Sequence, residues 1–373
     1  MPSFRHRERR SFIARGATFK LARGRARVAG FRLGATPAQT RHLSRAGERE
    51  ASASSVDLEI LVENVLNAVT AGITIGCIYG LMCIGLGLIF GIMRIVNFAQ
   101  GELLMLGMFA SFYLVTGGKP LAFLGPYWGP FVGAICAAPL VFAGGALLHK
   151  FLISRVSGLR TAGSLDEGHF GQLVVTLGIS LILQNGGQIL FGSTPVAVRT
   201  PLSAEAYLIG PVYGAATVFL NKAKLIAFFV AILVALVLYL TLEYTRLGKA
   251  LRAAADNPTA ATYMGIDVDK AYRIAFGLGS GITAVAGGLM ATYISFGPFV
   301  GFDYVIIMYS GVVLGGMGSI LGAFWGGLTV GFVQQFSALI LPPQLQNAAI
   351  FVVFLMIVLL RPQGLFGRSA ERA

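Results

Sequence analysis

Charged residues are scarce in this chain of 373 residues: they make up 12% of it, against 55% hydrophobic residues and a mean hydropathy of +0.75. Soluble domains carry about 25% charged residues, so this chain lacks the polar surface that would keep it in water. The composition excludes an ordinary soluble enzyme or binding domain and predicts a polytopic membrane protein. The 49 glycines agree with this prediction, because small residues let membrane helices approach closely.

Cysteine and histidine are also rare. The three cysteines all lie in apolar segments, where isolated cysteines behave as small hydrophobes, so a disulfide framework or zinc site is not indicated. His149 and His169 flank one loop, at 150–170, and we expect both to be solvated. Neither a Ser–His pair nor a metal cluster at membrane depth follows from this pattern, which argues against an intramembrane enzyme.

Positive charge is concentrated in residues 1–55, which hold 13 Lys and Arg against three acidic residues. This segment lacks aromatic interleaving and hydrophobic periodicity, so we predict a basic disordered tail rather than a nucleic-acid-binding element. "RRSFIA" at Arg9–Ala14 matches a twin-arginine signal, but the apolar stretch that such a signal requires does not follow. Val56 opens "VDLEILVENVLNAVTAG", which is typical of a natural amino terminus. We therefore expect the native protein to consist of the transmembrane domain 56–373.

Apolar runs predict an all-α, polytopic transmembrane helical bundle with about 8–10 membrane segments, some of them interrupted. The run from Val65 to Met93 has 29 residues without a charge, which is long for one straight span and predicts a tilted or broken helix. The run at 303–318 is short enough to span incompletely. The apolar runs occupy about 60–93, 98–117, 130–149, 171–192, 223–243, 273–294, 303–318, 320–341 and 346–360.

Lys and Arg in the connections predict the orientation. Basic residues gather in the connections at 150–170 and 244–273 and in the carboxyl tail, so these should be cytoplasmic. The connections at 118–129, 295–302 and 342–345 have almost none and should face outward. The connection at 193–222 carries Arg199 and Lys222 and weakens the pattern.

The stretch "RIVNFAQGELLMLG", from Arg94 to Gly107, places polar side chains between two apolar runs. One interpretation is a helix break inside the bundle, since irregular backbone at membrane depth is tolerated where it lines a cavity or is buried in protein. The other places the stretch at the interface, with Arg94 and Glu102 reaching water. The second half has an analogous interruption, "SFGPFVGFDYVIIMYSGVVLGGMGSILG". Interrupted segments in corresponding halves point to a transport site, and we suggest a weak internal duplication.

The longest polar connection inside the apolar body is "EYTRLGKALRAAADNPTAATYMGIDVDKAYR", from Glu243 to Arg273. "LGKALRAAAD" is rich in helix formers. Asn257 and Pro258 should end that helix and begin a second one, as cap and first helical residue, and Gly265 suits its end. Two short helices would then present a protrusion to a partner at the cytoplasmic face. The alternative is a solvated amphipathic loop.

Here the residues show a resemblance. "G-x-A-L-R-A-A-A-D-N-P-x-A-A-x-x-M-G-I-D", Gly248–Asp267, resembles the ATPase-coupling loop of LivH-type permeases, which are membrane subunits of ABC importers for branched-chain amino acids. Asn67–Phe109, Leu177–Gly192, Val313–Gly331 and the closing "RPQGLFG" are similar to other patterns of this family, and together they cover residues from about 57 to 368 in order. The coupling loop spans 244–272. Its candidate residues are Gly248, Leu251, Arg252, Ala253, Asp256, Asn257, Pro258, Ala261, Gly265 and Ile266.

The resemblance implies a multi-pass subunit of the bacterial cytoplasmic (inner) membrane. Its partners would be a homologous second permease (LivM-type), two ABC ATPase subunits (LivG/LivF-type), an extracytoplasmic solute-binding protein and membrane lipid, without nucleic acid. The chain lacks a Gly-x-x-x-x-Gly-Lys-Ser/Thr motif, so ATP hydrolysis is expected from the partners. We therefore predict a transport subunit that is not an enzyme and holds no cofactor, with ATP and magnesium bound by the ATPases.

The two interrupted stretches themselves predict a translocation path that passes both of them. Helix amino termini at the breaks could face a substrate carboxylate, and Glu102 or Asp303 the ammonium group, although a simple helix cap fits Asp303 as well. Gln100 stands where the family commonly has histidine. Alternatives are a permease for urea or short amides and an ATP-independent channel or secondary transporter. The candidate path residues are Asn97, Gln100, Gly101, Glu102, Asp303, Gly315, Gly316 and Gly318.

Overall fold

A computed structural model describes residues 37–117, 121–156, 165–213, 216–361 and 363–366, with side chains from Leu58 onward except at some positions beside the gaps. The chain divides into two units, Met1–Leu58 and Glu59–Ala373. Residues 1–36 of the predicted disordered tail, including Arg9–Ala14, lie outside the described residues. The rest of that tail, 37–55, is helical, because Ala, Arg, Glu and Leu are good helix formers.

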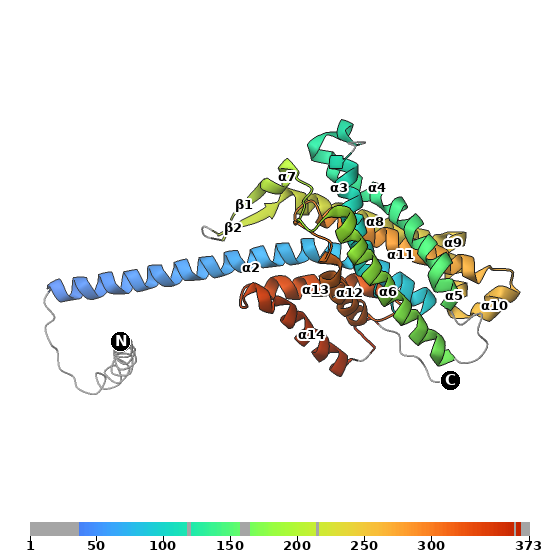
Figure 1. The fold of residues 1–373 in the computed structure, drawn as a ribbon. Helices are drawn as coiled ribbons and strands as arrows, with labels where there is room; N and C mark the ends of the chain where they lie inside the picture. Colours follow the sequence, from blue (N-terminus) through green and yellow to red (C-terminus); the bar gives the residue numbers. More distant parts are fainter. Residues whose placement is uncertain (1–36, 118–120, 157–164, 214–215, 362, 367–373) are drawn as a thin grey trace, which may run out of the picture. The chain divides into compact units, whose positions relative to one another are not determined.

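Helix α2 runs without interruption from Pro37 to Met93, as Figure 1 shows, so a break within the first apolar run is the wrong prediction. Its apolar part, Leu58–Met93, has 36 residues and is about 54 Å long at 1.5 Å per residue. The helix ends at Met93, and the next residue, Arg94, has a φ of 54°, in the left-handed region. The irregular backbone comes directly after it, at 94–99.

The remaining apolar runs form helices close to the predicted ranges. Within the described residues, six helices are long and apolar enough to cross a membrane, and α12 is shorter, as predicted. The chain is therefore a multi-pass helical membrane protein. The helical elements are α3 (Gln100–Phe112), η1 (Tyr113–Gly117), η2 (Ala122–Leu124), α4 (Gly125–Leu148), η3 (His149–Ile153), α5 (Ser154–Val156), α6 (Leu165–Phe191), α7 (Pro201–Ala204), α8 (Lys222–Tyr244), α9 (Arg246–Asp256), α10 (Pro258–Tyr263), α11 (Val268–Met290), α12 (Val300–Gly315), α13 (Ile320–Ser337), η4 (Pro343–Leu345) and α14 (Gln346–Leu360).

The connection at 193–222 adds a small element of sheet to a fold that is otherwise helical, as predicted. It holds an antiparallel hairpin of β1 (Ala206–Tyr213) and β2 (Ala216–Asn221). Both strands are rich in the aromatic and branched residues that favour extended backbone. The hairpin is fixed to α2, because the Phe219 amide donates to the Asn67 side-chain oxygen at 2.8 Å.

Helices α2 and α11 form the centre of the bundle. In the most apolar 18-residue stretch of each helix, 89% of α2 and 83% of α11 is buried, against 17% of α6 and 6% of α14. Helices α6 and α14 therefore lie at the outside of the bundle. Glycines allow the close approach: Gly76 of α2 packs on the Leu328 backbone of α13, and Gly85 packs on Gly279 and Thr283 of α11. These glycines thus act as packing positions, as expected of small residues in a membrane bundle.

Candidate functional site

The break after α2 lies inside the bundle. The Gln100 side-chain amide donates to the Gly279 carbonyl at 3.2 Å and to the Thr283 hydroxyl at 2.5 Å. Gly85 of α2 packs against the same two residues. Gln100 therefore lies beside Gly85, which is about 12 Å along α2 from Met93. The backbone therefore turns back into the bundle after Arg94. Of the two interpretations of this stretch, the geometry supports a helix break at membrane depth and not a position at the membrane interface.

Hydrogen bonds stabilise the irregular segment at 94–99. The Asn97 amide donates to the Gln100 side-chain oxygen at 2.9 Å, and the Asn97 side-chain oxygen accepts from the Ala99 backbone at 3.2 Å. Both side chains are fully buried. Gln100 thereby joins the break to α11, with one hydrogen bond to Asn97 and two to α11.

Replacing Gln100 with leucine should destabilise this region. The change leaves the Asn97 amide and the Thr283 hydroxyl buried without Gln100 as their partner, at a cost of about 1–3 kcal/mol. We expect a lower midpoint of thermal unfolding for the purified protein, and greater protease sensitivity at 94–99. The same change at Gln184, on the outer helix α6, is the control and should leave both unchanged. Equal midpoints for the two variants would contradict the assigned network.

Glu102 is buried in the first turn of α3. The Ser180 hydroxyl donates to its Oε1 atom at 3.4 Å, while Oε2 has no hydrogen-bond partner within the part of the chain that the structure describes. A β-carbon built at Gly301 would lie 2.8 Å from Oε2, so the carboxylate lies against the first turn of α12. Helix amino termini attract negative charge, which makes this a suitable place for a buried carboxylate. Incompletely bonded acidic groups at membrane depth are usually functional.

The two interrupted segments meet at their first helical turns. A β-carbon at Gly101 would overlap the Gly301 carbonyl and lie 3.0 Å from the Val305 side chain. In return, a β-carbon at Gly301 would lie 2.6 Å from the Gly101 carbonyl oxygen. Helices α3 and α12 thus touch backbone to backbone, and only glycine fits at either position. The two interruptions predicted from the sequence therefore lie directly against each other.

The other candidate path residues do not join this cluster. Asp303 is exposed in the first turn of α12, whereas Glu102 is buried, and Phe299 rather than Asp303 is the cap residue of that helix. Gly315 ends α12, about 21 Å along its axis from Gly301. Gly316 and Gly318 follow with φ of 99° and 93° and form the turn into α13. The carboxyl segment docks there, since the Phe366 amide donates to the Gly315 carbonyl at 3.2 Å.

His149 is fully buried, and the prediction of a solvated side chain was wrong. The chain continues past α4 as the π-helical turn η3, which turns His149 toward α11 with its ring centroid 6.0 Å from that of Phe276. Because His149 ends an apolar run, the sequence indicated the start of a loop there, but the helical backbone continues to Ile153. The side chain of His169 lies outside the described residues.

The connection from α8 to α11 forms the predicted pair of short helices, which we call the protrusion (α9 and α10, Arg246–Tyr263). The Gly248 amide donates to the Thr245 hydroxyl at 3.2 Å, which caps α9. The Asn257 side chain caps α10 by accepting from the Ala260 amide at 3.0 Å, with Pro258 as first helical residue. Gly265 has the predicted left-handed φ, 81°.

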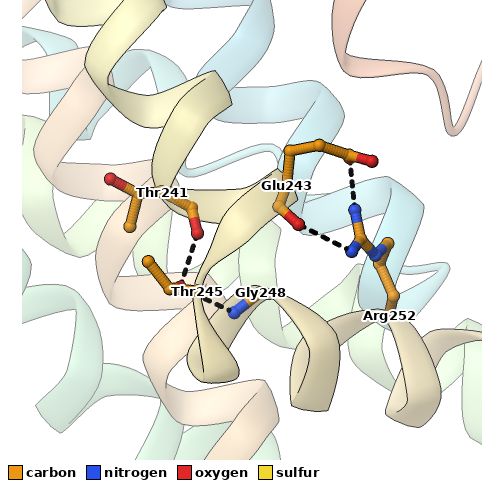
Figure 2. Close-up of polar contacts among 5 residues, drawn as sticks. All are labelled: Thr241, Glu243, Thr245, Gly248 and Arg252. Carbon is orange, nitrogen blue, oxygen red and sulfur yellow. Dashed lines mark hydrogen bonds and ion pairs between the residues drawn. The ribbon is translucent and has the colours of Figure 1, made fainter.

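Polar contacts hold the protrusion to the end of α8, as Figure 2 shows. Arg252 forms an ion pair with the Glu243 carboxylate and donates to the Glu243 carbonyl at 3.1 Å. Gly248 packs so closely on α8 that a β-carbon there would overlap the Leu242 carbonyl. The Tyr272 hydroxyl of α11 donates to the Ala254 carbonyl at 3.4 Å. The protrusion is therefore attached to both α8 and α11.

The ten candidate coupling residues divide between an inner and an outer face. Gly248, Leu251 and Ala261 are buried, Ala253, Pro258 and Ile266 are half-buried, and Arg252, Asp256, Asn257 and Gly265 are exposed. Sequence reasoning missed Tyr263 and Met264, which are 85% and 81% exposed at the end of α10. The available signal was a pair of apolar residues directly before the helix-ending Gly265, in a connection that otherwise faces water.

Comparisons with known proteins identify the family. The sequence pattern of the family described as "Branched-chain amino acid transport system / permease component" matches residues 68–360. The high-affinity branched-chain amino acid transport system permease protein LivH of Escherichia coli (strain K12) is 29% identical over 306 residues, which cover 80% of this chain and 94% of that protein. BraD of Pseudomonas aeruginosa, named in the same way, is 29% identical over 311 residues, 82% of this chain and 97% of that protein.

A more distant relative carries a different name. The autoinducer 2 import system permease protein LsrD of Escherichia coli (strain SMS-3-5 / SECEC) is 26% identical over 264 residues, 65% of this chain and 76% of that protein. No solved structure matches the chain significantly. The family pattern begins in α2 and extends through α14, and so includes both the buried break and the protrusion. The chain belongs to the branched-chain amino acid transport system permease component family.

Proposed function

We propose that this chain is one of two membrane-spanning subunits of an ATP-driven importer for leucine, isoleucine and valine in the bacterial inner membrane. A homologous permease, two ATPases and an extracytoplasmic binding protein would complete the complex. The observation that carries the proposal is the protrusion: two capped helices attached to α8 and α11, with the exposed apolar side chains of Tyr263 and Met264 at the tip. Such a shape suits docking into a groove of a partner.

A single helix connects the protrusion to the buried break. Helix α11 begins at Val268, directly after the protrusion, and carries Gly279 and Thr283, to which Gln100 is hydrogen-bonded. We infer that ATP-driven closure of the ATPases displaces the protrusion and moves α11. The break and its Glu102 carboxylate would move with α11, opening the path to alternate sides. Asn97, Gln100, Gly101 and Glu102 would line or support that path.

Glu102 is the residue that we assign to the substrate ammonium group. Its carboxylate is buried and incompletely bonded among the described residues, and the adjoining first turn of α12 offers backbone amides to a substrate carboxylate. The names of LivH and BraD favour branched-chain amino acids. Urea and short amides remain the alternative, and they lack the charged pair of groups that this site would recognise. Binding measurements on the partner binding protein distinguish these solutes, because that protein selects the solute first.

The complex itself is the direct test. Gentle purification of the full chain from its native membrane should yield a second permease and two ATPase subunits, and uptake should stop when the ATPases are deleted. A permease that purifies alone and sustains uptake without ATPases would reject the importer and favour a channel or secondary transporter. Neither of those needs a cytoplasmic docking element.

Charge reversal at Arg252 tests the base of the protrusion. Arg252→Glu places two carboxylates together at Glu243 and should lower uptake about tenfold. The amount of inserted protein should not change, because an exposed ion pair contributes only about 0–1 kcal/mol to stability. The double variant Arg252→Glu/Glu243→Arg restores opposite charges. Recovery of uptake would show that Arg252 positions the protrusion; loss without recovery would indicate direct contact with the ATPase. Normal uptake by the single variant would reject a coupling role.

A further inference from the structure

An apolar groove of about 520 Å³ lies between α3, α4 and α6. Its lining includes Leu103 and Leu106 of α3, Leu140 and Leu147 of α4, and Leu183 and Phe191 of α6. The hydroxyl of Tyr113 is the one polar side-chain group among the described lining residues. A groove of this composition has nothing to offer a polar solute and is distinct from the buried break around Glu102.

The groove borders an outer helix. Only 17% of the most apolar 18-residue stretch of α6 is buried, against 83% of the corresponding stretch of α11. Helix α6 is therefore incompletely packed against the rest of the bundle. Gly144 of α4 lines the groove, and a β-carbon built there would meet nothing within 4 Å. In a bilayer, an unfilled apolar groove beside a peripheral helix is accessible to lipid acyl chains.

Positive charge lies at one end of this groove. Phe151 of η3 lines it, and the Lys150 ammonium group lies 5.5 Å from the centroid of the Phe151 ring. Lys150 and Arg155 are both exposed. The adjacent His149 packs on Phe276 of α11, which places this end of α4 beside the first turns of α11, near the protrusion. Lys and Arg near the cytoplasmic end of membrane helices attract anionic headgroups.

We propose that the groove binds a phospholipid with an anionic headgroup from the cytoplasmic leaflet. One acyl chain occupies the space between α4 and α6, and the headgroup phosphate lies against Lys150. The bound lipid supplies the packing that α6 lacks toward α4. Helix α6 also carries Ser180, the hydrogen-bond donor to Glu102, so the lipid helps to hold that donor in place. This site is independent of which solute the protein transports.

Two variants isolate the two parts of the site. Gly144→Leu fills the groove from a position where the new side chain has open space, and Lys150→Glu reverses the charge at its end. Gly186→Leu is the matched control for the first, since a β-carbon there also meets nothing within 4 Å and Gly186 does not line the groove. Arg199→Glu, at an exposed arginine of the 193–222 connection, is the control for the second.

The experiment is native mass spectrometry of the full chain, purified with the subunits that accompany it and exposed to equal amounts of phosphatidylglycerol and phosphatidylcholine. The wild type should retain phosphatidylglycerol preferentially. Gly144→Leu should lose most of the bound lipid, and Lys150→Glu should reduce the preference about fivefold. Both controls should behave as the wild type. If Gly144→Leu fails to assemble, Lys150→Glu decides the result. Equal retention of the two lipids by the wild type, or unchanged retention of phosphatidylglycerol by the variants, would overturn the proposal.

Discussion

Replacing Gly101 with leucine is expected to lower uptake at least tenfold. The first turns of α3 and α12 touch at Gly101 and Gly301, and even a β-carbon at Gly101 would overlap the Gly301 carbonyl. Backbone atoms cannot rotate away as a side chain can, so the larger side chain must separate the two helices. Overpacking of this kind typically costs about 1–3 kcal/mol, and more where the surroundings cannot relax. The displacement acts on Glu102, the next residue in the chain.

A graded series makes this prediction decisive. Gly101→Ala, Gly101→Val and Gly101→Leu should lower uptake progressively, with at least a tenfold loss for leucine, as measured with radiolabelled leucine in cells containing equal amounts of inserted protein. Gly186→Leu introduces the same side chain on α6, where a β-carbon has open space, and should transport normally. Normal uptake by Gly101→Leu would show that α3 and α12 do not cross at these glycines in the working protein.

The protrusion could be predicted because its signals are local. Asn257 and Pro258 determine the start of α10 within a few residues, and Gly265 determines its end through a left-handed φ. The cap on α9 is equally local, since Thr245 bonds to Gly248. Each signal acts between residues at most four apart, so tertiary packing had little opportunity to override it. The sequence did not predict which side chains at the tip of the protrusion are exposed, because the burial of each one depends on how the protrusion packs on α8 and α11.

The buried break could be predicted only as an interruption. Its polar residues stand out against the apolar runs, but Gln100 finds its partners at Gly279 and Thr283, which are 179 and 183 positions away. The contact between Gly101 and Gly301 is equally distant. Pairings over such separations depend on the packing of whole helices, which a single sequence does not specify. For the same reason Gly315 was grouped with Gly101, although α12 separates them.

The length of α2 shows a different limit of sequence reasoning. A run of 29 uncharged residues from Val65 suggested a tilted or broken helix, on the assumption that a span matches the bilayer thickness. The helix is instead continuous to Met93, and its central position explains this result. The most apolar 18-residue stretch of α2 is 89% buried in protein. Neighbouring helices, more than lipid, therefore determine the length of α2. The irregular backbone begins only at Arg94, after this helix ends.

The tip of the protrusion should be essential for uptake and dispensable for folding. Tyr263 and Met264 are exposed and support little of the structure, so replacing both with serine should leave the amount and thermal stability of the inserted protein unchanged. Large apolar side chains at the centre of an interface often contribute at least about 2 kcal/mol each, which corresponds to about 30-fold in affinity. The double variant should therefore lose most of its ATPase binding, measured by co-purification, and uptake should fall at least tenfold.

Two equally exposed apolar residues provide the control. Phe123 and Ile340 are 81% and 86% exposed. Phe123 belongs to the connection at 118–129 and Ile340 lies just before the connection at 342–345, and both connections are predicted to face outward. Their replacement by serine therefore removes similar surface from the other side of the membrane. That variant should retain its ATPases and its uptake. If both double variants lose the ATPases equally, general destabilisation is the cause. If neither does, the tip is not the docking point, and the ATPases must engage the protrusion through its base, around Arg252.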